Sequence, residues 1–207
     1  MRRRPPNAVV DGVGLVREAR GARRLRRAAG AASTGGRSFG GALAAADSLE
    51  RHLGGRLPDT LDLCPYLTRI ATLMQMSDAT ISTLLTNIAP LRVPSSQARV
   101  LAVALNEFTC FLLGCAQPDR SMDLCLVVAV DGDRLVVALA AMGELEPVPA
   151  RAAMAALLRG ARLVECVGGL VSRGVEPERI VIGMTFDDAA LMGAIAGKGP
   201  HGHTDDA

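Results

Sequence analysis

The stretch ALNEFTCFLLGCA, residues 104–116, decides the fold of this 207-residue chain. Its apolar residues fall on nearly every side of an ideal helix, and the only strongly polar pair within it is Asn106-Glu107. A helix without a polar face is buried on most sides in a globular protein. Upstream, Ser95 or Ser96 is a suitable N-cap. We therefore expect a long central helix that ends near Cys115, with the other elements packed around it.

The segments around this helix alternate between strand-like and helical patterns. The sequences TISTLLTNI (80–88) and PLRVP (90–94) are typical of strands, and Asp62 is a candidate N-cap for a helix that carries Leu63, Leu67, Ile70 and Met74 on one face. Downstream, MDLCLVVAV and RLVVALAA flank an Asp-Gly turn, which predicts a β-hairpin.

A last helix and a last pair of strands complete the pattern. Residues 150–167 are helical in spacing and are followed by Gly168-Gly169, a pair suited to a helix C-cap. The strands GLVS and RIVIGMTF lie on either side of the loop RGVEPE. From residue 61 to 187 the order predicts an α/β sandwich, with one mixed or antiparallel sheet and helices on one face.

The N-terminal part predicts a helical hairpin. Residues 7–28 carry Val9, Val10, Val13, Val16 and Leu25 at roughly helical spacing, with arginines on the other face, and a Gly/Ser-rich turn follows at 30–41. A second helix runs from Ser38 or Gly41 to His52. Two helices alone bury little apolar surface, so we expect them to dimerise with a second copy of the chain. The domains are therefore 1–53, 54–187 and a disordered tail at 188–207, in the α+β class.

Composition and charge exclude several classes of protein. The chain has no run of 18 uncharged apolar residues, so we expect a soluble, cytoplasmic protein that does not enter a membrane. Residues 1–27 hold nine arginines against Asp11 and Glu18, which is typical of a solvated basic helix, an organellar transit signal or a nucleic-acid arm. We favour the solvated helix, because the net charge is only +2 and aromatic residues, on which bases stack, make up 2%.

The five cysteines form neither a disulfide framework nor a zinc site by spacing, because their number is odd and no CxxC pair occurs. Cys110, Cys115, Cys125 and Cys166 lie in apolar runs, which predicts reduced, buried thiols.

Three groups of segments resemble the sensor histidine kinases, particularly the HWE-type family. AAADSLERHL followed by DTLDLCPYLTRIATLM is similar to the end of the dimerisation helices and the entry to the catalytic domain. APLRVPSSQARVLAVALNEF is similar to the family's strand, proline loop and long helix. RLVECVGGLV followed by RIVIGMTF is similar to its last helix and sheet edge. The resemblance implies a dimerisation hairpin joined to an ATPase-type α/β sandwich.

The resemblance also implies a nucleotide site, and the first box of that site is incomplete. The family pattern has a glutamate and, four residues later, an asparagine that holds Mg²⁺. Here Asn106 and Glu107 are present, but Phe111 stands at the asparagine position. A phenyl ring cannot coordinate Mg²⁺, which requires oxygen ligands. Gly114 and Cys115 stand where basic residues are expected.

The other two boxes depart from the family pattern as well. In the second, Gly143 matches the first glycine, while Ala141 replaces the aspartate that would bind adenine and Leu145 replaces the second glycine. Alanine offers adenine no hydrogen-bond acceptor. In the third, Met154 and Ala156 replace glycines that let backbone N–H groups approach phosphates.

No histidine occupies the phosphoacceptor position that the resemblance implies, which falls near Arg2 or Arg3. The three histidines are His52, at the end of the second predicted helix, and His201 and His203 in the tail. An exposed helix-end residue is the simplest interpretation of His52, and a displaced phosphoacceptor is the alternative.

Two hypotheses of function follow from this resemblance. The first is a degenerate two-component signalling protein that forms a homodimer and binds a response-regulator receiver domain or a partner histidine kinase, with no catalytic residue, no metal site and no cofactor. Asn106, Glu107 and Gly143 are then remnants of a nucleotide pocket. The histidine phosphotransferases are similar in design, since they keep the helical bundle and a decayed ATP domain. The alternative is an active, ATP- and Mg²⁺-dependent histidine kinase with divergent motifs. A nucleic-acid binder is a third and weaker class.

Overall fold

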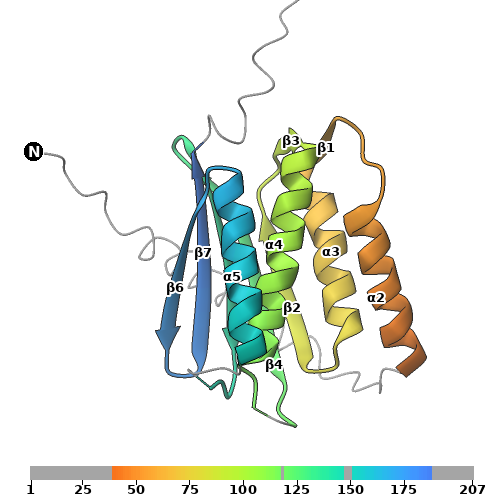
Figure 1. Ribbon diagram of the computed structural model, residues 1–207, viewed down its shortest axis with the longest axis vertical. Coiled ribbons are helices and arrows are strands. Elements are labelled where there is room, and N and C mark those ends of the chain that lie inside the picture. Colours follow the sequence, from red (N-terminus) through yellow and green to blue (C-terminus); the bar gives the residue numbers. More distant parts are fainter. Residues whose placement is uncertain (1–38, 118, 147–150, 188–207) are drawn as a thin grey trace, which may run out of the picture.

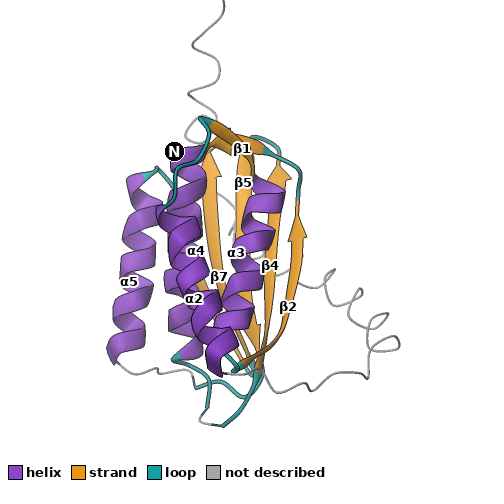
Figure 2. Ribbon diagram, turned by 90° about the vertical axis from the view of Figure 1, so that its right-hand side faces the viewer, coloured by secondary structure: helices purple, strands orange, loops and turns teal. Residues whose placement is uncertain are grey.

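A computed structural model describes residues 39–117, 119–146 and 151–187, and Figure 1 shows how their helices and strands are arranged. Four helices form one layer. They are α2 (Phe39–Gly54), α3 (Leu63–Ser77), α4 (Ser95–Leu113) and α5 (Arg151–Cys166). Figure 2 shows that all four lie on one face of the main sheet. The predicted α+β sandwich with helices on one face is confirmed.

The main sheet has five strands in the order β2-β4-β5-β7-β6. Their bounds are β2 (Ile81–Ile88), β4 (Met122–Asp131), β5 (Arg134–Met142), β6 (Leu170–Glu176) and β7 (Arg179–Asp187). Strands β2 and β4 are parallel, and every other neighbouring pair is antiparallel. The sheet is therefore mixed, because α4 crosses over between β2 and β4 while hairpins join the later strands.

A second, two-stranded sheet lies at one end of the helix layer. Strand β1 (Thr60–Asp62) pairs antiparallel with β3 (Arg92–Pro94). The segment around β3 was predicted to be a strand, but β1 was not, because three residues carry no periodicity. The pair places the starts of α3 and α4 side by side, since each helix follows one of these strands directly.

The main core lies between the helix layer and the sheet. Three of the four phenylalanines, Phe108, Phe111 and Phe186, are at most 1% exposed there. Aliphatic side chains from the four described helices belong to the same cluster. A chain with no tryptophan therefore fills its core with leucine, valine, isoleucine, methionine and a few rings. The helix α4 contributes ten buried residues, so its predicted central position is confirmed.

Two glycine-based turns form as the sequence predicts. Gly132, between β4 and β5, has φ of +60°, and Gly168, just after α5, has φ of +77°. The amide of Gly169 donates a hydrogen bond of 3.0 Å to the carbonyl of Val164, which closes the end of α5. Both φ values lie in the left-handed region, which glycine enters without a steric penalty.

Of the two predicted N-caps, Asp62 is confirmed in position and Ser95 or Ser96 is corrected by the structure. Asp62 occupies the N-cap position of α3, but its side chain makes no capping hydrogen bond. Helix α4 begins at Ser95 with Pro94 at the N-cap. The Ser95 hydroxyl donates instead to the carbonyl of Pro58, across to the chain that precedes β1. The tertiary contact has replaced the local cap.

Two further predictions were wrong in detail. The loop RGVEPE is shorter than expected, since β6 continues to Glu176 and β7 begins at Arg179. Cys110 and Cys166 are exposed, whereas Cys115 and Cys125 are buried as predicted. A residue with apolar neighbours in the sequence is still exposed when it lies on the side of its helix that faces solvent.

Helix α2 packs beside α3, with Ala45 and Leu49 at 4% and 7% exposure. The predicted helix at 7–28 and the predicted tail at 188–207 lie outside the described residues, and the division at residues 53 and 54 stays a prediction. No helix in the described ranges is long and apolar enough to span a membrane.

Candidate functional site

The predicted site residues lie on two separate parts of the sandwich, helix α4 and the chain after β5. Asn106 is half-buried within α4, Glu107 follows it, and Gly143 begins the chain that leaves β5. Glu107 hydrogen-bonds to α5, and Gly143 hydrogen-bonds to the turn between β6 and β7. The structure therefore gives Glu107 and Gly143 separate structural partners.

Glu107 is held by an arginine that the sequence did not indicate. The Nε and Nη2 atoms of Arg159, on α5, donate to the same Glu107 carboxylate oxygen at 3.1 and 2.8 Å. The Glu107 side chain is 20% exposed and that of Arg159 is 58% exposed. The hydrogen bond to Glu107 raises the pKa of the Arg159 guanidinium. The carboxylate thus links α4 to α5, as a paired structural carboxylate does.

Phe111 is completely buried, at the position where the resemblance implies a Mg²⁺ ligand. It belongs to the main core together with Ala141, Ala153 and Ala156. The guanidinium carbon of Arg173, on the edge strand β6, lies 5.9 Å from the centre of its ring, within the range of a cation–π contact. Phe111 is therefore a core residue of the sandwich.

Helices α4 and α5 approach each other closely along their length. A Cβ atom built on Gly114 would lie 2.4 Å from the Cβ of Ala153, and one built on Gly160 would lie 2.5 Å from the ring of Phe108. Real Cβ atoms are essentially never this close to another heavy atom. The two glycines therefore permit a direct contact between the helices, over the side where the third nucleotide box would lie.

The chain after β5 is fastened to the end of α4. The amide of Glu146 donates to the carbonyl of Cys115 at 2.7 Å, and the amide of Gln117 donates to the carbonyl of Glu144 at 3.3 Å. Ala116 and Leu145 form an isolated antiparallel bridge between these hydrogen bonds. Leu145, which replaces the second glycine of its box, therefore belongs to a small ladder beside α4.

Gly143 has a conformational role in this arrangement. Its φ is +150°, which few residues with a side chain adopt, and its amide donates to the carbonyl of Glu178 at 3.0 Å. A Cβ atom there would lie 3.2 Å from the carbonyl oxygen of Ser121. The residue thus turns the chain from β5 towards α4 at a place with little room.

The remaining box positions offer no polar group. Ala141 is completely buried and Ala156 is 2% exposed, both within the main core. Met154 is partly buried and packs against the same core. No group of three or more histidine, cysteine, aspartate or glutamate side chains in the described ranges could hold a metal ion.

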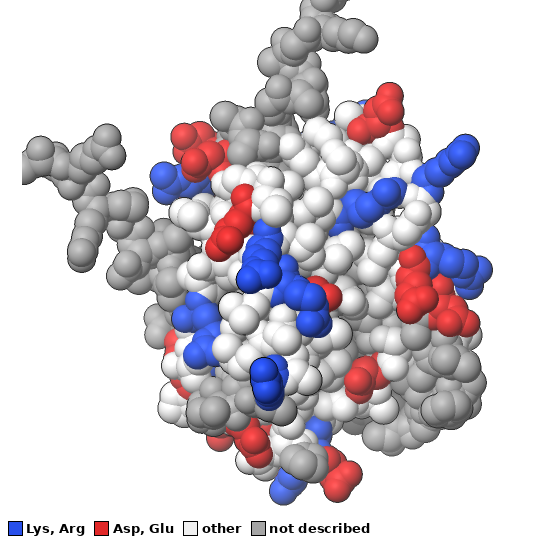
Figure 3. Space-filling view, viewed as in Figure 1, with Lys and Arg blue, Asp and Glu red and all other residues white. Residues whose placement is uncertain are grey.

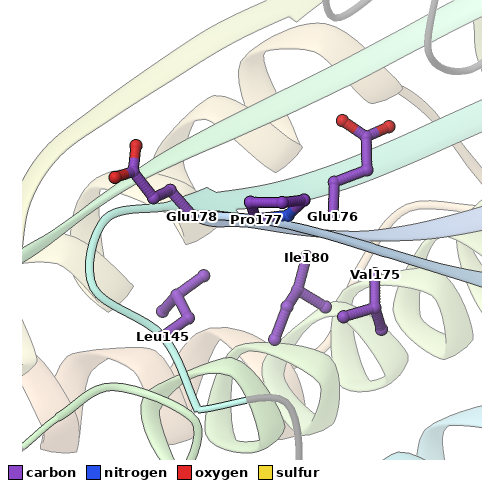
Figure 4. A pocket seen from close by; sticks show the side chains of 6 residues that line it. All are labelled: Leu145, Val175, Glu176, Pro177, Glu178 and Ile180. Carbon is purple, nitrogen blue, oxygen red and sulfur yellow. The ribbon is translucent and has the colours of Figure 1, made fainter.

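Several hollows lie at this end of the molecule. One of about 280 Å³ is lined by Leu145, Ile180 and residues 175–178. Figure 4 shows that Glu176 and Glu178 point away from Leu145 and Ile180. A second hollow of about 460 Å³ includes Arg120, whose Nε lies 3.4 Å from a carboxylate oxygen of Glu144. Small-molecule sites have volumes of about 300–1,000 Å³, so only the second hollow falls within that range. Carboxylates at the rim of either hollow disfavour a polyphosphate.

Comparisons with known proteins place this fold among histidine kinase domains. No family model matches the chain, and no curated protein matches it by sequence. The histidine kinase domain of a blue-light-activated histidine kinase from Erythrobacter litoralis matches with a TM-score of 0.57 and 17% identity, over 76% of this chain and 80% of that one. A bacterial phosphotransferase matches with a TM-score of 0.52 and 14% identity, over 68% and 72%. The chain has a histidine-kinase-like fold.

Proposed function

We propose that this chain is a two-component signalling protein that works by binding a response-regulator receiver domain or a partner histidine kinase, without ATP chemistry of its own. The observation that carries the proposal is the complete burial of Phe111 at the position of the implied Mg²⁺ ligand. The direct α4–α5 contact and the ladder between Leu145 and Ala116 support it, because both occupy space beside the implied nucleotide position.

A titration with ATP and Mg²⁺ tests the nucleotide half of this proposal. We expect no saturating heat in calorimetry at millimolar nucleotide, since adenine has no acceptor at Ala141 and Mg²⁺ no oxygen ligand at residue 111. Saturation in the micromolar range would overturn the proposal. It would instead favour the alternative, an active histidine kinase that uses Asn106 and Glu107.

The surface of α5 supports the binding half of the proposal. Arg151, Leu158, Arg159 and Arg162 are exposed on this helix, and Leu158 is 57% exposed. Figure 3 shows basic side chains gathered over α5 and the adjoining strand β6. A phosphoryl-accepting aspartate that uses Mg²⁺ needs other carboxylates beside it, so the active face of a receiver domain is acidic and complements this surface.

A binding screen against receiver domains tests this second half. We expect at least one to bind, and Arg162→Glu to weaken that binding by about tenfold or more because a charge in the contact is reversed. Arg56→Glu is the matched control, since Arg56 is an arginine outside this helix. Equal losses in both variants, or binding that neither variant changes, would contradict a docking surface on α5.

A further inference from the structure

The sheet face turned away from the helices carries a second apolar cluster. Its members come from the three central strands and have exposures of 0–9%: Cys125, Val127, Ala138, Ala140, Met142 and Val181. Leu85 of β2 packs against them. They alternate along each strand with residues of the main core, as the period of two in a strand requires. The cluster therefore lies on the outer face of the sheet.

No described helix or strand covers this outer face. Figure 2 shows the four described helices on the opposite side. A sheet face in contact with water leaves its side chains partly exposed, whereas Ala138 and Ala140 are both 0% exposed. The described helices and strands therefore do not explain the burial of this cluster.

The position of the cluster indicates which end of the chain reaches it. Met142, the member nearest one end, pairs with Asp123 and Arg179 near the starts of β4 and β7. Figure 1 shows that α2 begins at this same end, so residues 1–38 join the fold here. The C-terminal residues instead leave β7 after Asp187, which pairs with Arg134 at the far end of the sheet.

The N-terminal segment also has a suitable pattern and length. Val9, Val10, Val13 and Val16 fall on one side of an ideal helix. A helix over residues 7–28 would be about 33 Å long, close to the length of about 33 Å for the ten-residue strand β4. Residues 29–38 can span at most about 35 Å, enough to pass the edge strand β2 because packed layers lie about 10 Å apart.

We propose that residues 7–28 of the same chain pack their four valines on the outer face of the sheet. The two parts carry opposite net charge, since residues 1–27 are strongly basic and the rest of the chain holds more acidic than basic residues. The same valines then do not serve the dimerisation hairpin expected from the sequence. The inference does not rest on the proposed function, since it concerns the opposite face from the α5 surface.

Cysteine reactivity tests the proposal in the full chain, because Cys125 is a member of the cluster and is 1% exposed. Thiols are labelled with a maleimide in the native state, and mass spectrometry follows each site. Cys110 and Cys166 are exposed and should react first. Cys115, buried in the main core, reports whether the sandwich itself remains folded. In the wild type we expect Cys125 to react as slowly as Cys115.

The variant Val9→Asp with Val13→Asp places two carboxylates on the valine side. We expect it to speed the labelling of Cys125 by about tenfold or more while Cys115 stays slow, because the cover opens without global unfolding. The matched control is Ala8→Asp with Leu15→Asp, which adds the same charges on the opposite side of the same helix. The control should label as the wild type does.

Three outcomes would overturn the proposal. One is unchanged protection of Cys125 in the valine variant. Another is loss of protection in a full-length Leu191→Asp and Met192→Asp variant instead, which would make the C-terminal segment the cover. The last is protection that weakens on dilution, which would assign the cover to a second copy. If the valine variant also exposes Cys115, the single variant Val13→Asp at lower temperature must still separate the two thiols, or the proposal fails.

Discussion

At the scale of single residues, Phe111 carries the strongest argument about the nucleotide site. We predict that Phe111→Asn lowers the free energy of unfolding by about 3 kcal/mol or more, since it opens a cavity and buries an amide without partners. It should not create ATP binding, because Ala141 remains unable to contact adenine. Urea unfolding and calorimetry measure the two effects.

Cys110→Asn is the control for this variant. Cys110 precedes Phe111 on the same helix but is exposed, so the same amide there should change the unfolding free energy by no more than about 0.5 kcal/mol. Equal urea midpoints for Phe111→Asn and the wild type would mean that residue 111 faces solvent, in contradiction to the closed arrangement.

The buried thiol of Cys115 leads to a prediction about how stability depends on pH. Burial raises the pKa of its thiol from 9.0 to about 11, with Arg173 partly opposing the rise. A thiol with a raised pKa stabilises the fold below pH 9, and that contribution is lost as the pH rises towards 11. The stability advantage of the wild type over Cys115→Ala should therefore shrink between pH 9 and pH 11. Guanidinium unfolding at fixed pH values measures this difference, and a constant difference would contradict it.

Single residues also show which contacts the sequence alone does not predict. The sequence indicated that residue 111 is apolar and that Glu107 lies on a mostly apolar helix. It did not indicate Arg159, because a partner 52 positions away becomes a neighbour only when α4 and α5 pack together. The exposure of Cys110 was missed for a related reason, since the orientation of a mostly apolar helix depends on its neighbours.

At the scale of elements, the contact between α4 and α5 depends on two glycines. We predict that Gly160→Ala destabilises the fold by about 1–3 kcal/mol, because the new methyl group would meet the ring of Phe108. The sign of the change in unfolding free energy tests this prediction. At an unhindered position inside a helix, the same change stabilises by roughly 0.5–1 kcal/mol.

Gly54→Ala is the comparison for this prediction. A Cβ atom at Gly54, the last residue of α2, would have no heavy atom within 4 Å. The melting temperature of Gly160→Ala should therefore fall below that of the wild type. The melting temperature of Gly54→Ala should rise or stay unchanged. A stabilised Gly160→Ala variant would mean that α4 and α5 lie farther apart than described.

Elements with strong local signals were predicted well. The β4–β5 hairpin depends on the turn at Gly132, and the end of α5 depends on Gly168, so both could be located from a few neighbouring residues. Strand β1 and the capping of α4 depend on partners distant in the sequence. Ser95 illustrates this, because its hydroxyl bonds to Pro58 rather than to its own helix.

At the scale of the whole molecule, α2 extends the helix layer beside α3. We predict that Leu49→Ala lowers the unfolding free energy by about 2–4 kcal/mol in a single cooperative transition, since Leu49 is 7% exposed within the main core. Glu50→Ala, at an exposed neighbouring position, should have little effect. Far-ultraviolet circular dichroism during urea unfolding distinguishes the outcomes, and a separate early transition would show that α2 unfolds by itself.

The parallel pairing of β2 with β4 has a consequence for the growing chain on the ribosome. Among the described strands, β2 lies at the sheet edge and pairs only with β4, and α4 separates the two in the sequence. Until residue 131 has left the exit tunnel, β2 has no strand partner, and the described helices α2, α3 and α4 have no complete sheet to pack against. Synthesis at about 5–20 residues per second makes this interval last seconds. Unpaired strand edges can bind other chains during such intervals. We therefore expect co-translational chaperones to bind the nascent chain at this stage, before the last three described strands are made.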